Sequence, residues 1–213
     1  MNALEIPRET PLEAPLETRI RLPRDERRAQ LLVAALEIFT VAGYHSAAMD
    51  EIAERAGVSK PVLYQHFPSK LELYLAVLDI NIEFLVTQIH QAIASSTEND
   101  SRVRATVDAY YSFIDNGGES YRLLFENDMS SEPAVRERLN RMTHDCAEAV
   151  STAISQDTGI PKDASMLIGV ALMGCAQMTA RHWLEHEIQL TGEEATGLIT
   201  NFIWRGLSGL PRN

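Results

Sequence analysis

The chain has 213 residues, of which 45% are hydrophobic, and it carries 19 Lys and Arg against 30 Asp and Glu. Such a chain folds as a globular protein, either as one large domain or as a small domain joined to a larger one. The two cysteines exclude a disulfide framework and a cysteine-rich metal site. No apolar run reaches the roughly 18–20 residues of a membrane span. We expect a reduced, cytoplasmic protein with no membrane partner.

The net charge of −11 is distributed unevenly along the chain. Residues 19–70 hold eight Lys and Arg against six acids, whereas the remainder holds eleven against twenty-four. A mildly basic segment joined to a strongly acidic body indicates two regions with different partners. The first residues carry acids and prolines instead of the basic start and apolar core of a signal peptide. We therefore divide the chain into a flexible tail at 1–20, a first domain at 21–68 and a second at 69–213.

Helical spacing of apolar residues recurs almost throughout, and the alternation typical of strands is nearly absent. The first predicted helix begins near Asp25 and Glu26 and stops at Gly43. Two short helices follow, and then a long one that ends in the sequence SSTEND. The later helices are predicted over about 100–115, 119–127, 132–156, 162–187 and 192–207. The prediction is an all-α fold of nine helices, with a three-helix N-terminal unit and a larger helical bundle.

The segment MDEIAERAGVSKPVLYQHF has the pattern of a helix-turn-helix. Gly57 suits the turn, where we expect a positive φ, and Leu63 belongs to the small core between the two helices. Ser59 is a good N-cap for the second helix, with its hydroxyl expected on the amide of Val62. Pro61 then falls in the first turn, where proline is tolerated. The alternative is a helical hairpin with a polar, solvated face.

The exposed side chains of this second helix are candidate DNA contacts. Tyr64 and His66 can hydrogen-bond to phosphates, with which Lys60 pairs electrostatically. Gln65 can bind an adenine edge in the major groove. A further phosphate contact is expected from Lys70, at the start of the next helix. Two apolar residues complete the surface and offer a contact for a thymine methyl group: Pro61 and Val62.

The stretch AALEIFTVAGYHSAAMDEIAERAGVSKPVLYQHFPSKLELYLAVL resembles the DNA-binding domain of the TetR family over about 45 residues. The shared features are the aromatic–Gly–Tyr turn, IAERAGVSK, LYQHF and SKLELY. The resemblance implies a DNA-binding regulator, not an enzyme. It carries DNA contacts over to Ser59, Lys60, Tyr64, His66 and Lys70. In one departure, Ala48 stands where many members place a threonine, so the capping box of the first motif helix is incomplete.

A narrower similarity, in LPRDERRAQLLVAALEIF, YRLLFEND and WRGLS, is to actinobacterial members that regulate fatty-acid synthesis. It implies promoters of lipid-synthesis genes as targets and a long-chain acyl-CoA as effector, with no other cofactor and no metal. The family also implies a homodimer through the last two long helices, bound to a palindromic double-stranded operator. Four small residues would permit close helix approach there: Gly169, Ala171, Gly174 and Ala176.

An acyl chain needs a long apolar tunnel in the second domain. Each candidate lining residue also fits an ordinary core, and together they are Leu85, Ile89, Ile93, Tyr110, Phe113, Ile114, Leu124, Phe125, Val170 and Met173. Phosphates of a CoA would bind arginines. Six are equal candidates: Arg102, Arg104, Arg122, Arg136, Arg138 and Arg141.

Two other functions fit parts of the sequence. HWLEH, from His182 to His186, matches an inverted zinc-protease pattern. Such enzymes take a further acidic ligand well downstream, and the motif falls in an expected dimer helix, so we expect ordinary polar residues near a helix end. The second alternative is a TetR-type repressor that senses a drug or another apolar small molecule, with Glu126 and Asp128 balancing a cationic one. The sequence leaves open whether DNA binding activates or represses.

Overall fold

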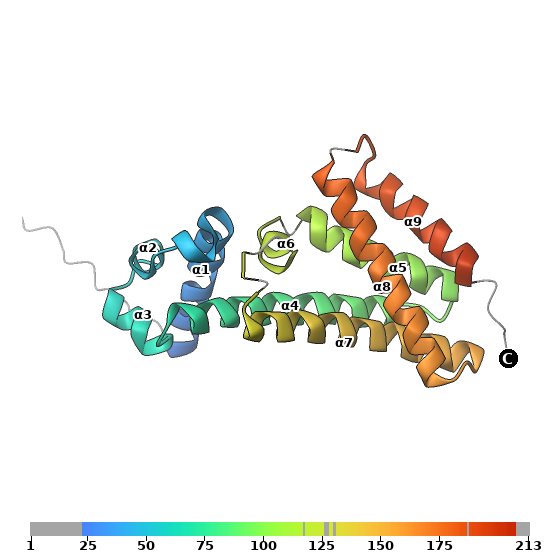
Figure 1. The fold of residues 1–213 in the computed structure, drawn as a ribbon, viewed down its shortest axis with the longest axis horizontal. Coiled ribbons are helices and arrows are strands. Elements are labelled where there is room, and N and C mark those ends of the chain that lie inside the picture. The colour runs from blue at the N-terminus through green and yellow to red at the C-terminus, as the bar shows by residue number, and fades with distance from the viewer. Residues whose placement is uncertain (1–22, 117, 126–127, 130, 187, 208–213) are drawn as a thin grey trace, which may run out of the picture.

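The computed structural model describes residues 23–116, 118–125, 128–129, 131–186 and 188–207, so the tail expected at 1–20 lies outside the described part. Within these residues the chain forms nine helices and no strand, which confirms the all-α prediction. Figure 1 shows a small N-terminal unit at one end of the long helix α4 and a larger bundle around the rest of it.

The N-terminal unit consists of α1 (Arg24–Ser46), α2 (Met49–Arg55) and α3 (Lys60–His66). Its core contains Ile52 and Leu63, both fully buried, as the helix-turn-helix pattern predicts. The turn glycine Gly57 has a φ of 63°, which an L side chain rarely adopts. Gly43 has a φ of 74° and interrupts α1 near its end, where the first helix was expected to stop.

The bundle consists of α4 (Lys70–Ala94), α5 (Asn99–Asn116), α6 (Gly118–Phe125), α7 (Pro133–Thr158), α8 (Lys162–Glu185) and α9 (Gly192–Leu207). The side chain of Ser69 caps α4 by accepting a hydrogen bond of 3.1 Å from the amide of Glu72. From there α4 runs beside α7 and under α5, while α8 crosses α7 and α9 packs on α5 (Figure 1). One helix thus connects the DNA-binding unit with the interior of the bundle.

The contact between α7 and α8 is unusually close at Gly169. A Cβ atom added there would lie 2.5 Å from the carbonyl oxygen of Ala147, nearer than real Cβ atoms approach. Gly169 and Ala176 are both buried within the chain, whereas Ala171 is exposed and Gly174 has open space around it. Two of the four small residues expected at a dimer interface therefore serve internal packing, because they face α7 and the core and not the outer surface.

Two helices, α4 and α8, are long and apolar enough to cross a bilayer by length and composition, each with a mean hydropathy of 1.2. By length and mean hydropathy, the expectation that no segment could span a membrane is therefore wrong. Core helices have the same composition, however, and α4 packs against α1, α5, α6 and α7.

Burial raises the pKa of the Cys146 thiol to about 12. This cysteine therefore packs as a small apolar side chain.

Candidate functional site

The N-terminus of α3 begins as expected, with one difference. Ser59 is the N-cap residue, and its carbonyl accepts bonds from the amides of Val62 and Leu63 at 3.0 and 3.2 Å. Pro61 lies in the first helical turn, as predicted. The hydroxyl of Ser59 makes no capping bond, so that part of the prediction is wrong. The exposed hydroxyl is therefore not committed to the helix end.

The outer face of α3 presents most of the predicted DNA contacts together. Ser59, Lys60, Pro61, Tyr64 and Gln65 are exposed, while Val62 and His66 are half-buried at its edges. Tyr64 is 40% exposed, and the ammonium of Lys60 lies 2.8 Å from a carboxylate oxygen of Asp50 on α2. The DNA role of each residue stays a prediction, but the structure brings these side chains to one surface.

Three arginines of α1 lie near the end of α3, and sequence reasoning did not single them out. Burial, together with Arg24, Arg28 and Arg27, lowers the pKa of His66 below its ordinary value. The lowered pKa favours the neutral imidazole near pH 7 when DNA is absent. The guanidinium of Arg28 lies 4.4 Å from the ring centre of Phe67 at the end of α3. The excess of basic residues before residue 70 was the signal for these arginines.

Lys70 has a structural role that the sequence did not indicate. Its ammonium donates to the carbonyl oxygens of Tyr44, His45 and Ala47 at 2.7, 3.2 and 2.9 Å. It also lies 4.6 Å from the centre of the Tyr44 ring. An ammonium has three donors, and all three are used at the end of α1. Without DNA, the ammonium of Lys70 therefore has the helix-end carbonyls as partners, and its phosphate contact stays a prediction.

Replacing Lys70 with methionine tests this role. We expect a loss of about 2 kcal/mol in the free energy of unfolding, because the three carbonyl groups at the end of α1 lose a charged donor. Thermal and urea unfolding, at one protein concentration, measure the loss. A phosphate role would instead leave stability unchanged and weaken DNA binding alone.

The turn after α6 is attached to the same end of α1. The carboxylate of Asp128 accepts hydrogen bonds from the amides of Tyr44 and His45 at 3.2 and 3.4 Å. It also lies against Gly43, where a Cβ atom would approach it to 3.2 Å. Asp128 therefore joins the bundle to the DNA-binding unit. It does not line the main cavity, and Glu126, its partner in the drug-sensor alternative, lies outside the described residues.

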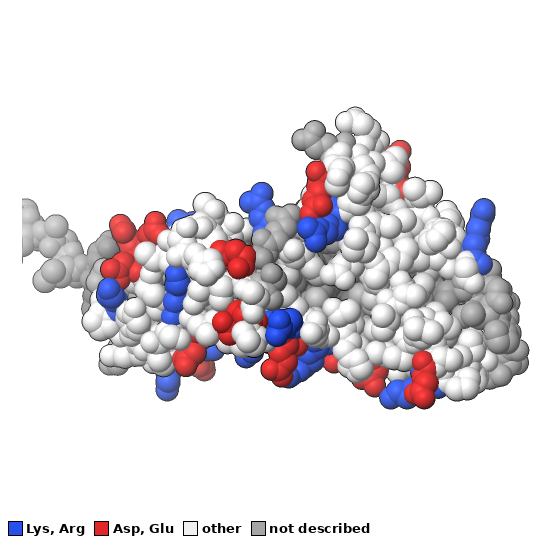
Figure 2. All heavy atoms as spheres, in the orientation of Figure 1, with Lys and Arg blue, Asp and Glu red and all other residues white. Residues whose placement is uncertain are grey.

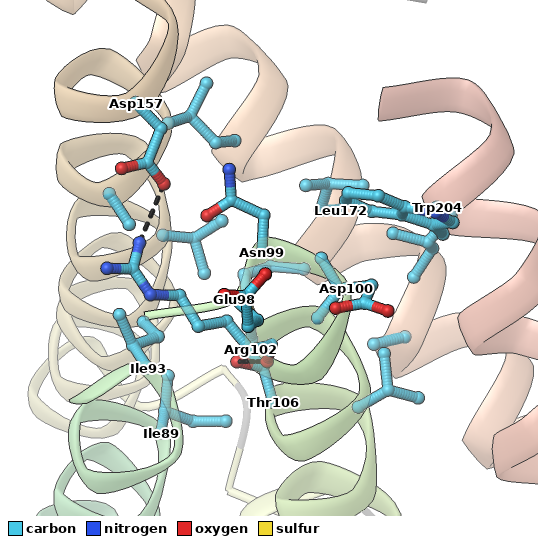
Figure 3. Close-up of a pocket in the computed structure, with 18 of the residues that line it drawn as sticks. Ile89, Ile93, Glu98, Asn99, Asp100, Arg102, Thr106, Asp157, Leu172 and Trp204 are labelled. Atoms are coloured by element: carbon cyan, nitrogen blue, oxygen red, sulfur yellow. Dashed lines mark hydrogen bonds and ion pairs between the residues drawn. The ribbon is translucent and has the colours of Figure 1, made fainter. Parts of the chain in front are cut away.

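The bundle encloses a cavity of about 530 Å³ between α4, α5, α7, α8 and α9. Four predicted residues line it: Ile89, Ile93, Tyr110 and Met173. Apolar residues that the sequence reasoning missed complete the wall, among them Val103, Val107, Ile154, Leu172, Ile203 and Trp204. Figure 3 shows Ile89 and Ile93 on one side of the cavity and Leu172 and Trp204 on the opposite side.

The other six predicted lining residues do not reach this cavity. Five of them pack in the core or against it, with α5 and α6 contacting each other and α4: Leu85, Phe113, Ile114, Leu124 and Phe125. Val170 is 46% exposed on α8. Their apolar spacing placed them correctly on buried or apolar faces, but it did not say which neighbouring helix each face meets.

The open end of the cavity is polar and mostly acidic. Arg102 donates to Asp157 at 2.7 Å (Figure 3). It also donates to the carbonyl of Ser96 at 2.8 Å. Glu98 and Asp100 lie at the same rim. Among the six candidate arginines, Arg102 is the one that lines this cavity, whereas Arg138 and Arg141 pair with carboxylates elsewhere.

The outer faces of α8 and α9 expose large apolar side chains, and a groove runs between the two helices. Figure 2 shows few charged side chains on the face over these two helices, compared with the N-terminal unit. The exposed residues include Leu167 at 73%, Met178 at 65%, Leu198 at 60% and Phe202 at 68%. A contiguous apolar patch of this kind marks an interaction surface.

The zinc alternative finds no support in the described part of the chain. His182 and His186 stack at the end of α8, with ring centres 4.2 Å apart. Among the described residues no three His, Cys, Asp or Glu side chains are grouped as a metal site. Both histidines are exposed, as expected for polar residues near a helix end.

A helix-turn-helix unit with an exposed second helix, attached to a bundle with an internal cavity, is the architecture of a DNA-binding transcriptional regulator. Residues 31–77 match the family model of bacterial regulatory proteins, tetR family. Over 191 residues, 90% of this chain and 87% of the relative, the chain is 48% identical to the HTH-type transcriptional activator FasR of Mycolicibacterium smegmatis. The protein belongs to the TetR family of transcriptional regulators, which are not enzymes.

Solved structures agree with this assignment. A TetR-like regulator from Rhodococcus sp. RHA1 is 27% identical and has a TM-score of 0.69, covering 89% of this chain and 100% of that one. FadR of Bacillus subtilis, solved in complex with stearoyl-CoA, is 15% identical with a TM-score of 0.68, covering 85% of this chain and 97% of that one. At that identity, FadR supports the fold alone.

Proposed function

We propose that the protein regulates fatty-acid or lipid biosynthesis genes and that a long-chain acyl-CoA modulates its binding to operator DNA. The main support is the cavity of about 530 Å³, whose apolar walls come from five helices. This volume lies within the roughly 300–1,000 Å³ of small-molecule sites. The 48% identity to FasR adds support. FasR is named a transcriptional activator, which favours activation of the target genes by this protein as well. As a regulator of genes, the protein would act in the cytoplasm.

The cavity and the recognition helix are connected by α4. Its first turn follows α3 directly, and its later turns contribute Ile89 and Ile93 to the cavity wall. A ligand that shifts α4 therefore moves α3 as well. Because the two sites are coupled, DNA must change ligand affinity by the same factor by which the ligand changes DNA affinity.

A homodimer through α8 and α9 is part of the proposal. Its support is the exposed apolar face of these helices, which includes Leu198 and Phe202. Two-fold symmetry would place two α3 helices on a palindromic double-stranded operator, with half-sites one turn of DNA or a multiple apart. A ligand would then act by changing the separation of the two helices.

Acyl chain length provides the test. We expect affinity to rise from lauroyl- to palmitoyl-CoA, by up to about fifteenfold per two carbons while the cavity has room, at about 0.8 kcal/mol per buried CH₂. Trp204 lines the cavity, so its fluorescence reports binding. We also expect palmitoyl-CoA to change operator affinity in an anisotropy assay. Equal operator affinity with and without a long-chain acyl-CoA would refute the effector role.

The acidic rim favours a second candidate, a sensor of an apolar cation. Glu98, Asp100 and Asp157 surround the cavity mouth, with Arg102 as the basic residue that lines it in the described part of the chain. A thermal-shift comparison of palmitoyl-CoA with a cationic dye separates the candidates. Stabilisation by the dye alone would support the sensor, whereas stabilisation by the acyl-CoA alone would exclude it.

A further inference from the structure

A second hollow lies on the other side of Arg102. It is a groove of about 610 Å³ between α4 and α7, and it shares Ile93, Arg102 and Ala153 with the cavity. Figure 3 shows Arg102 reaching from α5 to Asp157 on α7, and this arginine lines both the cavity and the groove. The two hollows are therefore neighbours, with these three residues between them.

The groove has both apolar and polar lining residues, and its charged groups are poorly suited to negative charge. Thr152, Gln156 and His90 offer hydrogen-bonding groups along it, and Asp145 and Glu148 add carboxylates. Glu148 is paired with Lys162 at 3.0 Å, and both side chains of this ion pair are exposed. Among the described residues that line the cavity or the groove, no Lys and no Arg other than Arg102 occurs. Phosphates placed here would meet carboxylates, whereas neutral amides would find partners.

We propose that this α4/α7 groove binds the neutral, amide-bearing pantetheine arm of an acyl thioester, and that Arg102 donates to the thioester carbonyl between chain and arm. The guanidinium has five N–H donors. Its bonds to Asp157 and to the carbonyl of Ser96 leave donors for a ligand oxygen. The proposal rests on the proposed function, since the acyl chain must occupy the cavity. Phosphates attached to the arm then extend beyond the groove into solvent.

The first test removes the phosphates. We expect palmitoyl-pantetheine to bind within about threefold of palmitoyl-CoA, and palmitoyl-CoA affinity to hold or rise between roughly 0.05 and 0.5 M salt, because salt screens its repulsion from the acids. Trp204 fluorescence measures both. A loss of more than about tenfold on removing the phosphates, or a comparable fall with salt, would overturn the proposal, because phosphates would then be bound by basic groups.

The second test changes the groove and leaves the cavity intact. Gln156→Leu should weaken palmitoyl-pantetheine by about fivefold to tenfold, through one lost hydrogen bond, without weakening methyl palmitate, which has no arm. Arg102→Gln should weaken both, because both have a carbonyl, and Arg102→Lys should recover part of the loss. The control is Arg141→Gln, whose guanidinium pairs with Glu137 away from both hollows.

The outcomes separate this proposal from the proposed function. If neither palmitoyl-CoA nor methyl palmitate binds, the proposed function fails. If both bind and Gln156→Leu affects them equally, the function stands and the groove assignment fails. Acyl-CoA and acyl carrier protein have the same arm, so palmitoyl acyl carrier protein is compared in the same assay. Binding of only one assigns the arm to that source, and binding of neither overturns the proposal.

Discussion

Replacing Tyr64 with phenylalanine will weaken operator binding by about a hundredfold. A hydrogen bond from the tyrosine hydroxyl to a phosphate is worth about 1.5 kcal/mol or more, because its partner is charged. In a dimer on a palindromic operator the bond is lost twice, which gives about 3 kcal/mol. Tyr64 is 40% exposed, so its hydroxyl is not needed for folding. Fluorescence anisotropy, on an operator selected from random duplex DNA, measures the effect.

Lys60 and Asp50 provide a matched pair of variants on the same surface. Lys60→Ala should reduce the slope of log affinity against log salt by about one per half-site. Asp50→Asn should strengthen binding, because it removes a carboxylate that lies 2.8 Å from the Lys60 ammonium. If Tyr64→Phe and Lys60→Ala both leave affinity and salt dependence unchanged, α3 is not the DNA-contacting helix.

Replacing Gly169 with alanine will lower the melting temperature by about 5 °C. The added Cβ meets the carbonyl oxygen of Ala147 at 2.5 Å, so α7 and α8 must separate. We expect overpacking to cost about 3 kcal/mol and the better helix propensity of alanine to return about 1 kcal/mol. For a chain of this size, a net loss of about 2 kcal/mol corresponds to such a shift.

Gly174 in the same helix is the matched control. Nothing lies within 4 Å of a Cβ added there, so Gly174→Ala should leave stability unchanged or raise it by up to about 1 kcal/mol. Both variants are compared with the unmodified protein at the same concentration, because dimerisation would contribute to stability. Equal shifts for Gly169→Ala and Gly174→Ala would show that the close helix contact does not limit substitution.

The helices and the turn of the DNA-binding unit could be predicted from the sequence because their signals are local. Apolar spacing, the turn at Gly57 and the N-cap at Ser59 all act within a few residues of one another. The role of Lys70 could not be predicted in this way. Its three partners lie 23–26 residues earlier in the chain, and only the folded unit brings them together.

The cavity was predicted less completely, since spacing identifies a buried face but not its neighbour. Ile89 and Leu85 lie one turn apart on α4 and both are fully buried, yet only Ile89 lines the cavity. Arg102 is a similar case. Nothing in its local sequence separates it from the five other candidates. Its position at the cavity depends on a hydrogen bond to Asp157, which lies 55 residues away in the chain.

The attachment of Asp128 to the end of α1 has an experimental consequence. The amides of Tyr44 and His45 belong to the DNA-binding unit, but their acceptor belongs to the bundle. Their exchange with deuterated solvent therefore requires the two parts to separate locally, which makes them built-in reporters of that separation. Measuring the exchange of these two amides with ligand or with operator DNA added would show how strongly each of them holds the two parts of the molecule together.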